Sequence, residues 1–336
     1  MRSKIFASFC ILSIAWFAGS AAAQDVVKVG HLGITADAPF YIAIEKGYFR
    51  ERKIEVKLEP FVSAVPAMAP LASGEIQVVG GGIGPSLFNA YARSFPVRVV
   101  AHRARDVDGN AADILMVRSD LKGQIRRGAD LKGRKIAINA PGSPHTYMVA
   151  KLLEGDGLSL KDVELVYMPW PDMAPAFSSK AIDVGTIVEP FATQYEERGL
   201  ATIWKRGSDV VRNPAWEIAV LFYNDDWAKK NPRVANDFMV AYLMGAREMM
   251  DAWRGGKNRA EVVDIMIKNT RTKDRALYDK MHWGHIDPNG TIVKESLRDQ
   301  QEFFAKLGSV PKKVDIDAII DERYVKAALE KIGVHK

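Results

Sequence analysis

The sequence predicts an α/β protein of two lobes, each built on a mostly parallel sheet, followed by a helical C-terminal region. Short apolar runs of strand length alternate with helical segments between residues 26 and 223, which is typical of βαβ units. From residue 232 onward, apolar residues recur at helical spacing instead. No flexible linker divides the chain, so we expect strands to cross between the lobes.

In the first block, β-branched and alternating apolar residues predict strands at residues 26–30, 54–58, 76–79 and 97–101. Helical spacing, in two segments opened by a proline, predicts helices at residues 39–50, 64–73 and 85–93. The glycine-rich residues 80–84 are expected to form a turn before the last of these helices.

The second block repeats this alternation and is followed by long amphipathic segments. Strands are predicted at residues 113–117, 135–138, 163–167, 184–188, 202–204 and 217–223, and helices at 144–154, 174–180, 233–253, 259–269, 294–307 and 321–332. The strands at 113–117 and 217–223 are the expected crossings. Lobe 1 is therefore predicted to comprise residues 24–112 plus 224–336, and lobe 2 residues 113–223.

The first residues predict a secretory signal peptide. Arg2 and Lys4 precede an apolar run at residues 5–18, and small residues at Ala21 and Ala23 place cleavage after Ala23. We therefore expect residues 1–23 to be removed and the protein to be periplasmic. The only cysteine, Cys10, lies in this segment, so no disulfide, thiolate nucleophile or cysteine metal site is expected in the remainder.

Composition excludes several classes of protein. With 48% hydrophobic and 26% charged residues the chain is globular, and its net charge of +6 includes no basic run interleaved with aromatic residues, so no nucleic-acid partner is expected. We find no nucleophile elbow, HExxH motif or P-loop, and expect neither enzyme activity nor a cofactor. His282 and His285 have no evident third ligand, so no metal site is predicted.

Four stretches carry a resemblance to a known family. They are VKVGHLGITADAPFYIAIEKGYFRERKIEVKL (27–58), LASGEIQVVGGGIGPSL (71–87), DLKGRKIAINAPGSPHTYMVAKLL (130–153) and KAIDVGTIVEPFAT (180–193). In this order, behind a signal peptide, the chain resembles the nitrate/sulfonate/taurine and thiamine-pyrimidine-precursor class of ABC-transporter solute-binding proteins. The resemblance covers nearly all of the chain after residue 23.

The resemblance implies a two-lobed type II periplasmic-binding-protein fold, with the ligand in an interlobe cleft that closes by hinge bending. It also implies a small organic ligand, an inner-membrane permease and its ATPase as partners, and we expect a monomer. One branch of the resemblance is an enzyme that makes the thiamine pyrimidine with a cysteine-rich motif. The absence of cysteine after residue 23 argues against that activity.

Candidate ligand contacts follow the carboxyl ends of predicted strands, where ligands of open α/β sheets bind. They are Thr35, Asp37, Phe40, Gly82, Ile83, Gly84, Ser86, Ser143, His145, Thr146, Glu189 and Trp216. Glycines allow close approach of the backbone, and helix N-termini attract anions. A ligand-facing role for Glu189 is implied by the resemblance.

Each of these residues also has a structural interpretation. Asp37 and Ser143 suit helix caps, Phe40 and Trp216 suit a core, and Glu189 suits a carboxylate held by backbone amides. The cluster His102, Arg103 and Arg105 is interpreted as solvated loop charge more readily than as an anion site.

The nature of the ligand is left with alternatives. Helix N-termini and nearby arginines favour an organic sulfonate or an aromatic carboxylate. If Asp37 and Glu189 both face the cleft, they favour a ligand with N–H donors, such as a pyrimidine precursor of thiamine, and would repel a simple anion such as nitrate. The same cleft would also serve a sensory ligand-binding protein.

Overall fold

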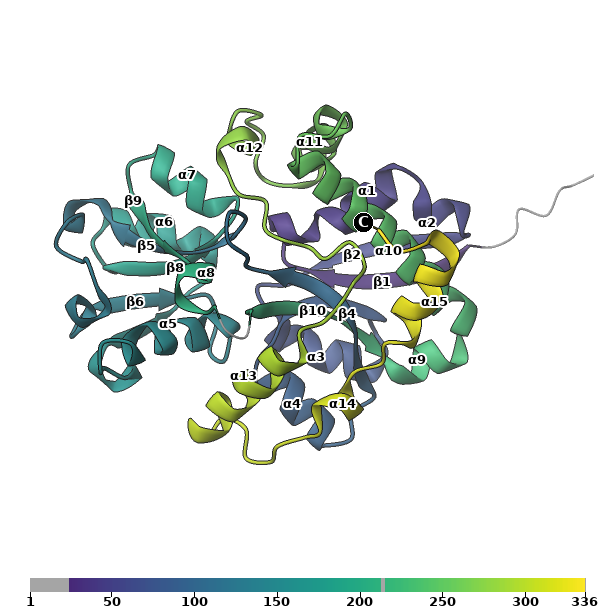
Figure 1. The fold of residues 1–336 in the computed structure, drawn as a ribbon, viewed down its shortest axis with the longest axis horizontal. Coiled ribbons are helices and arrows are strands. Elements are labelled where there is room, and N and C mark those ends of the chain that lie inside the picture. The colour runs from purple at the N-terminus through teal and green to yellow at the C-terminus, as the bar shows by residue number, and fades with distance from the viewer. Residues whose placement is uncertain (1–23, 213–214, 336) are drawn as a thin grey trace, which may run out of the picture.

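The computed structural model describes residues 24–212 and 215–335, and the predicted signal peptide lies outside them. Two sheets of five strands lie in separate halves of the molecule (Figure 1). The first has the order β2-β1-β3-β10-β4, formed by Ile54–Pro60, Asp25–His31, Val78–Gly82, Glu217–Asn224 and Val97–Arg105. The second has the order β7-β6-β8-β5-β9, formed by Glu164–Tyr167, Lys135–Ile138, Val184–Val188, Asp113–Arg118 and Ala201–Arg206.

Each sheet is mostly parallel, as predicted, with one reversed strand. In lobe 1, β1 pairs in parallel with β2 and β3, whereas β10 runs antiparallel to β3 and β4. In lobe 2, β6 pairs in parallel with β7 and β8, whereas β5 runs antiparallel to β8 and β9. The reversed strands are the two that the chain enters directly after crossing between the lobes. A strand entered from the cleft side must run opposite to those that end there.

Helices cover both faces of the lobe 1 sheet. On one face α1 (Ala38–Glu45), α10 (Pro232–Trp253) and α15 (Arg323–Ile332) pack on alternate strand residues such as Val29 and Leu221. The opposite face, with Val79 and Val220, packs on further helices. These are α3 (Ala64–Ser73), α4 (Pro85–Ala92), α13 (Lys294–Lys306) and α14 (Ile316–Ile319). The alternation follows from the two-residue period of side chains along a strand.

Lobe 2 has the same layered construction on a smaller scale. Ile136 and Ile138 face α5 (Pro144–Glu154), whereas Ala137 faces the layer with α6 (Trp170–Ser178) and α7 (Phe191–Glu197). The remaining helices are short or peripheral: α2 (Tyr48–Glu51), α8 (Gly207–Val210), α9 (Asp225–Lys230), α11 (Arg259–Asn269) and α12 (Leu277–Lys280). Short 3₁₀ turns occur at Thr35–Asp37, Ser119–Leu121, Gly128–Leu131 and Leu160–Asp162.

Two chain segments connect the lobes. Residues 106–112 lead from β4 to β5, and the segment before β10 returns the chain to lobe 1. A third segment, between α12 and α13, runs past the junction (Figure 1), where His285 forms a backbone bridge with Arg105. Because β10 pairs with β3 and β4, residues 217–223 belong to lobe 1, not to lobe 2 as the predicted boundary has it.

One helix and two strands differ from those predicted. The predicted helix at residues 39–50 is broken by Gly47, whose φ of 78° is left-handed. Gly80 to Gly82 continue strand β3 and do not form a turn. Strand β4 extends to Arg105, so His102 and Arg103 are buried strand residues and the interpretation as solvated loop charge is wrong. Within the described residues, no helix is both long and apolar enough to cross a membrane.

Candidate ligand-binding cleft

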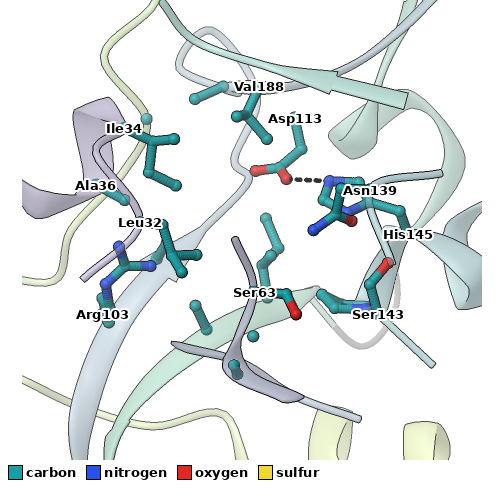
Figure 2. Close-up of a pocket in the computed structure, with 18 of the residues that line it drawn as sticks. Leu32, Ile34, Ala36, Ser63, Arg103, Asp113, Asn139, Ser143, His145 and Val188 are labelled. Carbon is teal, nitrogen blue, oxygen red and sulfur yellow. Dashed lines mark hydrogen bonds and ion pairs between the residues drawn. The ribbon is translucent and has the colours of Figure 1, made fainter. Parts of the chain in front are cut away.

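A cavity lies between the two lobes (Figure 2). Lobe 1 contributes residues that follow β1, β2 and β3 and the end of β4, and lobe 2 contributes residues that begin β5 and follow β6. Much of its wall is apolar, formed by side chains such as Leu32, Ile34, Trp170, Val188 and Ile218. Such a wall suits a ligand with an organic body.

Three helices begin at this cavity. The N-cap residues of α3 and α5 are Ser63 and Ser143, and Ser86 lies in the first turn of α4. Neither N-cap serine caps its own helix, and both Oγ atoms are buried without a hydrogen-bond partner. Because helix N-termini carry partial positive charge and free N–H groups, this convergence favours an anionic group of a ligand.

The glycines of β3 make this approach possible. A Cβ on Gly80 would lie 2.5 Å from Nε of Arg103, and one on Gly81 would lie 2.6 Å from Cβ of Ala64 in α3. A Cβ on Gly82 would lie 2.8 Å from Cδ of Pro144 in lobe 2. Side chains at these positions would therefore displace an arginine, a helix and the opposite lobe.

Arg103 is the first of two guanidinium groups at the cavity. Its side chain is only 1% exposed, and its Nη2 donates a 2.5 Å hydrogen bond to Oδ1 of Asp37. The other carboxylate oxygen of Asp37 accepts from the backbone N–H groups of Leu32 and Ile34. Burial alone would raise the pKa of Asp37, but the charge of Arg103 and the neighbouring His31, whose Nδ1 lies 3.7 Å from Oδ2, hold that pKa well below its ordinary value. Asp37 thus fixes Arg103 and the loop after β1.

The second guanidinium, Arg105, is also paired. Its Nε and Nη2 lie 3.3 Å and 3.2 Å from Oε2 of Glu217, the first residue of β10. The buried carboxylate of Glu217 also contacts Nδ1 of His102 and accepts from the backbone N–H of Val293. Glu217 therefore ties β4 and the segment before α13 to the strand that returns from lobe 2.

In lobe 2, His145 and Asp113 form a buried pair beside the cavity (Figure 2). Nε2 of His145 lies 2.7 Å from Oδ1 of Asp113, and Nδ1 has no partner. The ring meets the edges of Trp170 and Trp216 at centroid distances of 6.0 Å and 6.1 Å. Asn139 adds a buried Oδ1 without a partner. These atoms leave unused hydrogen-bonding capacity at the lobe 2 wall.

Asp106 lies where the chain leaves lobe 1 and also lines the cavity. Its Oδ1 accepts from the backbone N–H groups of Ala112 and Asp113, and its Oδ2 is buried without a partner. Burial, reinforced by the nearby charge of Asp113, raises the pKa of Asp106 well above its ordinary value. A protonated Asp106 would donate a hydrogen bond where an ionised one could only accept.

The two lobes touch beside the cavity. The backbone N–H and Oγ1 of Thr35 donate to the carbonyl oxygen of Glu189, and a Cβ on Gly84 would overlap the carbonyl oxygen of Gly142. The carboxylate of Glu189 points elsewhere and accepts from the backbone N–H and Oγ1 of Thr193, at 3.0 Å and 2.8 Å. Burial raises the pKa of Glu189 to about 7. The two lobes are therefore in direct contact beside the cavity.

A family model described as NMT1/THI5 like matches residues 35–252, which include most of these residues. The chain belongs to the NMT1/THI5-like family. It is 25% identical over 330 residues to a putative aliphatic sulfonates-binding protein of Bacillus subtilis, covering 93% of this chain and 92% of the relative.

Among solved structures, the fold matches that of the periplasmic aliphatic sulphonate binding protein SsuA from Escherichia coli. The TM-score is 0.70 at 20% identity, over 88% of this chain and 97% of SsuA. The desulfurization enzyme DSZB shares the fold, with a TM-score of 0.64 at 16% identity, over 92% of this chain and 100% of DSZB. The two-lobed α/β periplasmic-binding-protein fold is therefore established, and the fold alone does not separate binding proteins from enzymes.

The ligand contacts predicted from the sequence occupy three kinds of position in the structure. Five line the cavity: Thr35, Gly82, Ser86, Ser143 and His145. Three lie directly behind the cavity wall: Asp37 binds Arg103, Trp216 packs on His145, and the buried Thr146 follows His145. Two lie between the lobes: Gly84 contacts Gly142, and the carbonyl oxygen of Glu189 accepts a hydrogen bond from Thr35. Phe40 and Ile83 lie in hydrophobic cores, Phe40 against Tyr242.

Several cavity-lining residues were not among the predicted contacts. Ser63, Asp106, Asp113 and Asn139 were missed, the last three because no local sequence pattern indicates which way they face. Ser63 directly precedes an apolar helical segment, and this N-cap signal could have identified it as a residue at the start of a helix. Among the described residues no three His, Cys, Asp or Glu side chains are grouped to hold a metal ion, and His285 instead lines the cavity.

Proposed function

We propose that this protein is the solute-binding component of an ABC importer, which binds a small organic anion in the interlobe cleft and delivers it to a membrane permease. The anion is a sulfonate or an aromatic carboxylate. Export to the periplasm, predicted from residues 1–23, agrees with the likeness to SsuA, a periplasmic aliphatic sulphonate binding protein. Membership of the NMT1/THI5-like family and the likeness to a sulfonate-binding relative support the same class.

One observation carries the proposal: the convergence of three helix N-termini on a cavity with apolar walls. The anionic group would lie at the N-termini of α3 and α5, where Ser63 and Ser143 have free hydroxyls. The organic body would lie against Leu32, Ile34 and Val188. Both cavity arginines already have carboxylate partners, so the helix termini supply the uncompensated positive potential.

We propose binding without chemistry. On the lobe 2 wall, His145 has a free ring nitrogen, and its other ring nitrogen is hydrogen-bonded to Asp113. Among the described residues, no hydroxyl or thiol nucleophile is paired with His145. The interlobe contacts at Thr35 and Gly84 would instead form as the lobes close on the ligand. Closure would create the surface that a permease recognises. We propose that the carrier acts as a monomer.

A specific observation favours a second candidate, a pyrimidine precursor of thiamine. Asp113 places a carboxyl group at the cavity that would accept hydrogen bonds from ligand N–H groups, and a protonated Asp106 would donate a hydrogen bond to a ring nitrogen. A sensory protein using the same cleft is distinguished from a carrier by its partner, a signalling protein in place of a permease.

Thermal-shift screening followed by calorimetry of the purified protein tests the proposal. The probes are benzenesulfonate, benzoate, 4-amino-5-hydroxymethyl-2-methylpyrimidine and nitrate. We expect the sulfonate or the carboxylate to raise the melting temperature, since a ligand of the folded state stabilises it by mass action. The pyrimidine alone doing so would favour the second candidate, and a response to none would reject both.

Two serine variants then locate the anion. Ser63→Ala removes a free hydroxyl at the start of α3, and the matched variant Ser73→Ala removes an exposed one near the end of the same helix. We expect Ser63→Ala to weaken anion binding about tenfold or more, as for a lost hydrogen bond to a charged group, and Ser73→Ala to leave it unchanged. Equal affinities in both variants would place the anion elsewhere.

A further inference from the structure

A carboxyl group with an unused oxygen lines the cavity at the junction of the lobes. Asp106 directly follows β4 and is only 3% exposed. Its Oδ1 accepts hydrogen bonds from the backbone N–H groups of Ala112 and Asp113, whereas its Oδ2 is buried without a partner. Gly207 leaves space for Oδ2, because a Cβ on this glycine would overlap the oxygen. The carboxyl group is thus held in one place, with hydrogen-bonding capacity left for a ligand.

The charged groups beside Asp106 do not offset a negative charge there. The neighbouring acidic residue, Asp113, is itself paired with His145. Arg206 of β9 is the nearby positive charge, but its Nη1 donates to the carbonyl oxygen of Ala111 at 2.9 Å. Among the described residues, neither oxygen of Asp106 takes part in an ion pair.

The other ionisable groups of the cavity are paired elsewhere or uncharged. Arg103 and Arg105 each have a carboxylate partner. Burial, reinforced by the neighbouring His102, lowers the pKa of His285 to about 4, so this ring is neutral at neutral pH. Because burial of Asp106 is opposed by so little positive charge, and Asp113 lies beside it, the pKa of Asp106 stays well above its ordinary value.

A protonated Asp106 suits the anionic ligand proposed for this cavity. An ionised carboxylate in the same enclosed space would repel an anion, since charges interact strongly where little water screens them. A neutral carboxylic acid carries an O–H donor instead, and sulfonate and carboxylate oxygens accept hydrogen bonds. Asp106 would therefore add a donor to the serine hydroxyls and N–H groups at the starts of α3 and α5.

We propose that Asp106 binds the ligand as a neutral carboxylic acid, with its Oδ2–H donating a hydrogen bond to an oxygen of the anion. Where the free protein has lost this proton, binding takes one proton up from the solvent, and release of the ligand returns it. This inference rests on the proposed function and adds a ligand-binding residue and a link between ligand and proton. It favours oxyanions, whose oxygens accept the O–H, over ligands that present only N–H donors to Asp106.

Calorimetry of the purified protein with benzenesulfonate between pH 5 and pH 9 tests the link. A sulfonate remains ionised throughout this range, so a change in bound protons comes from the protein. We expect constant affinity while Asp106 stays protonated, and then a fall of up to about tenfold for each pH unit, as linkage to one proton requires. Titrations in two sulfonate-free buffers of different ionisation enthalpy should show proton uptake in the pH range of this fall.

Asp106→Asn should abolish this pH dependence. The amide oxygen can accept from the same two backbone N–H groups, and the amide N–H replaces the protonated Oδ2 as a donor. We expect this variant to keep the low-pH affinity of the parent protein up to pH 9, without proton uptake. Asp106→Ala, which lacks the donor, should bind about tenfold or more weakly at pH 5. Asp108→Asn makes the matched change at an exposed position of the same crossing segment and should keep the parent pH dependence.

Other outcomes would overturn the inference. Equal affinity for benzenesulfonate from pH 5 to pH 9, or parent-like binding by Asp106→Ala at pH 5, would reject the role of Asp106 and keep the binding protein. An unchanged fall in Asp106→Asn would assign the proton to another group, such as His145 or Glu189. Failure of benzenesulfonate and benzoate to bind at any of these pH values would overturn the anionic ligand, and the role of Asp106 with it.

Discussion

The carbonyl oxygen of Glu189 in lobe 2 accepts hydrogen bonds from the backbone N–H and Oγ1 of Thr35 in lobe 1, at 3.2 Å and 3.3 Å. These bonds join the lobes beside the cavity, and in an open form both donors would face water. Thr35 therefore contributes to the free-energy difference between open and closed forms. A residue of this kind affects ligand affinity through closure, even where it makes little contact with the ligand.

Replacing Thr35 with valine should shift the protein towards the open form. Loss of one hydrogen bond of about 1 kcal/mol predicts a roughly fivefold weaker ligand affinity, with lobe folding intact. Small-angle scattering with and without ligand, together with calorimetry, measures both effects. Thr202→Val is the control, because Oγ1 of Thr202 bonds to Val117 within lobe 2. Equal losses in both variants would contradict a role in closure.

Gly84 should tolerate no side chain in the closed form. A Cβ at this position would overlap the carbonyl oxygen of Gly142, so Gly84→Ala should hold the lobes apart and abolish ligand-induced compaction. Gly155→Ala, where a Cβ meets nothing nearer than 3.5 Å, is the matched substitution and should close normally. Normal compaction of Gly84→Ala in scattering would show that the lobes close by another path.

Removing the charge of Asp37 should destabilise lobe 1 strongly. Asp37→Asn leaves the buried Arg103 without its ionic partner, which costs about 3–5 kcal/mol in comparable pairs. Urea unfolding measures the free energy. The exposed pair of Asp25 and Arg233 provides the contrast, and Asp25→Asn should cost less than about 1 kcal/mol. A small loss in Asp37→Asn would mean that water or another group reaches Arg103.

Glu189 should make stability fall as pH rises. Its pKa is about 7 in the folded protein against an ordinary 4.5, so the unfolded chain loses the proton first. Stability is therefore lost between about pH 4.5 and pH 7 and stays lower above that range, by an amount on the order of 3 kcal/mol. Glu189→Gln should remove this fall in urea unfolding compared at pH 5 and pH 8. An unchanged pH dependence would assign the effect to other groups.

Local sequence signals predicted much of the fold and the part of the site that depends on helix starts. Ser143 and Ser86 were found because a serine next to a proline-initiated helix is visible within a few residues. Arg103 was misjudged because its burial depends on β4 continuing past Ala101 and on the space that Gly80 leaves in the neighbouring strand. Asp113 and Asn139 face the cavity only because lobe 2 meets lobe 1 there, which no local pattern encodes.

The internal pairing of Arg103 with Asp37 and of Arg105 with Glu217 bears on how the protein works in media of changing salinity. Exposed charges that attract an anion from a distance lose much of their effect once salt shortens the Debye length to about 8 Å. Here both arginines of the cavity are paired with carboxylates. The remaining attraction for an anion comes from backbone N–H groups at helix N-termini, which act only at short range inside the cavity. For the proposed anionic ligand, capture by such a site would start slowly and depend little on ionic strength.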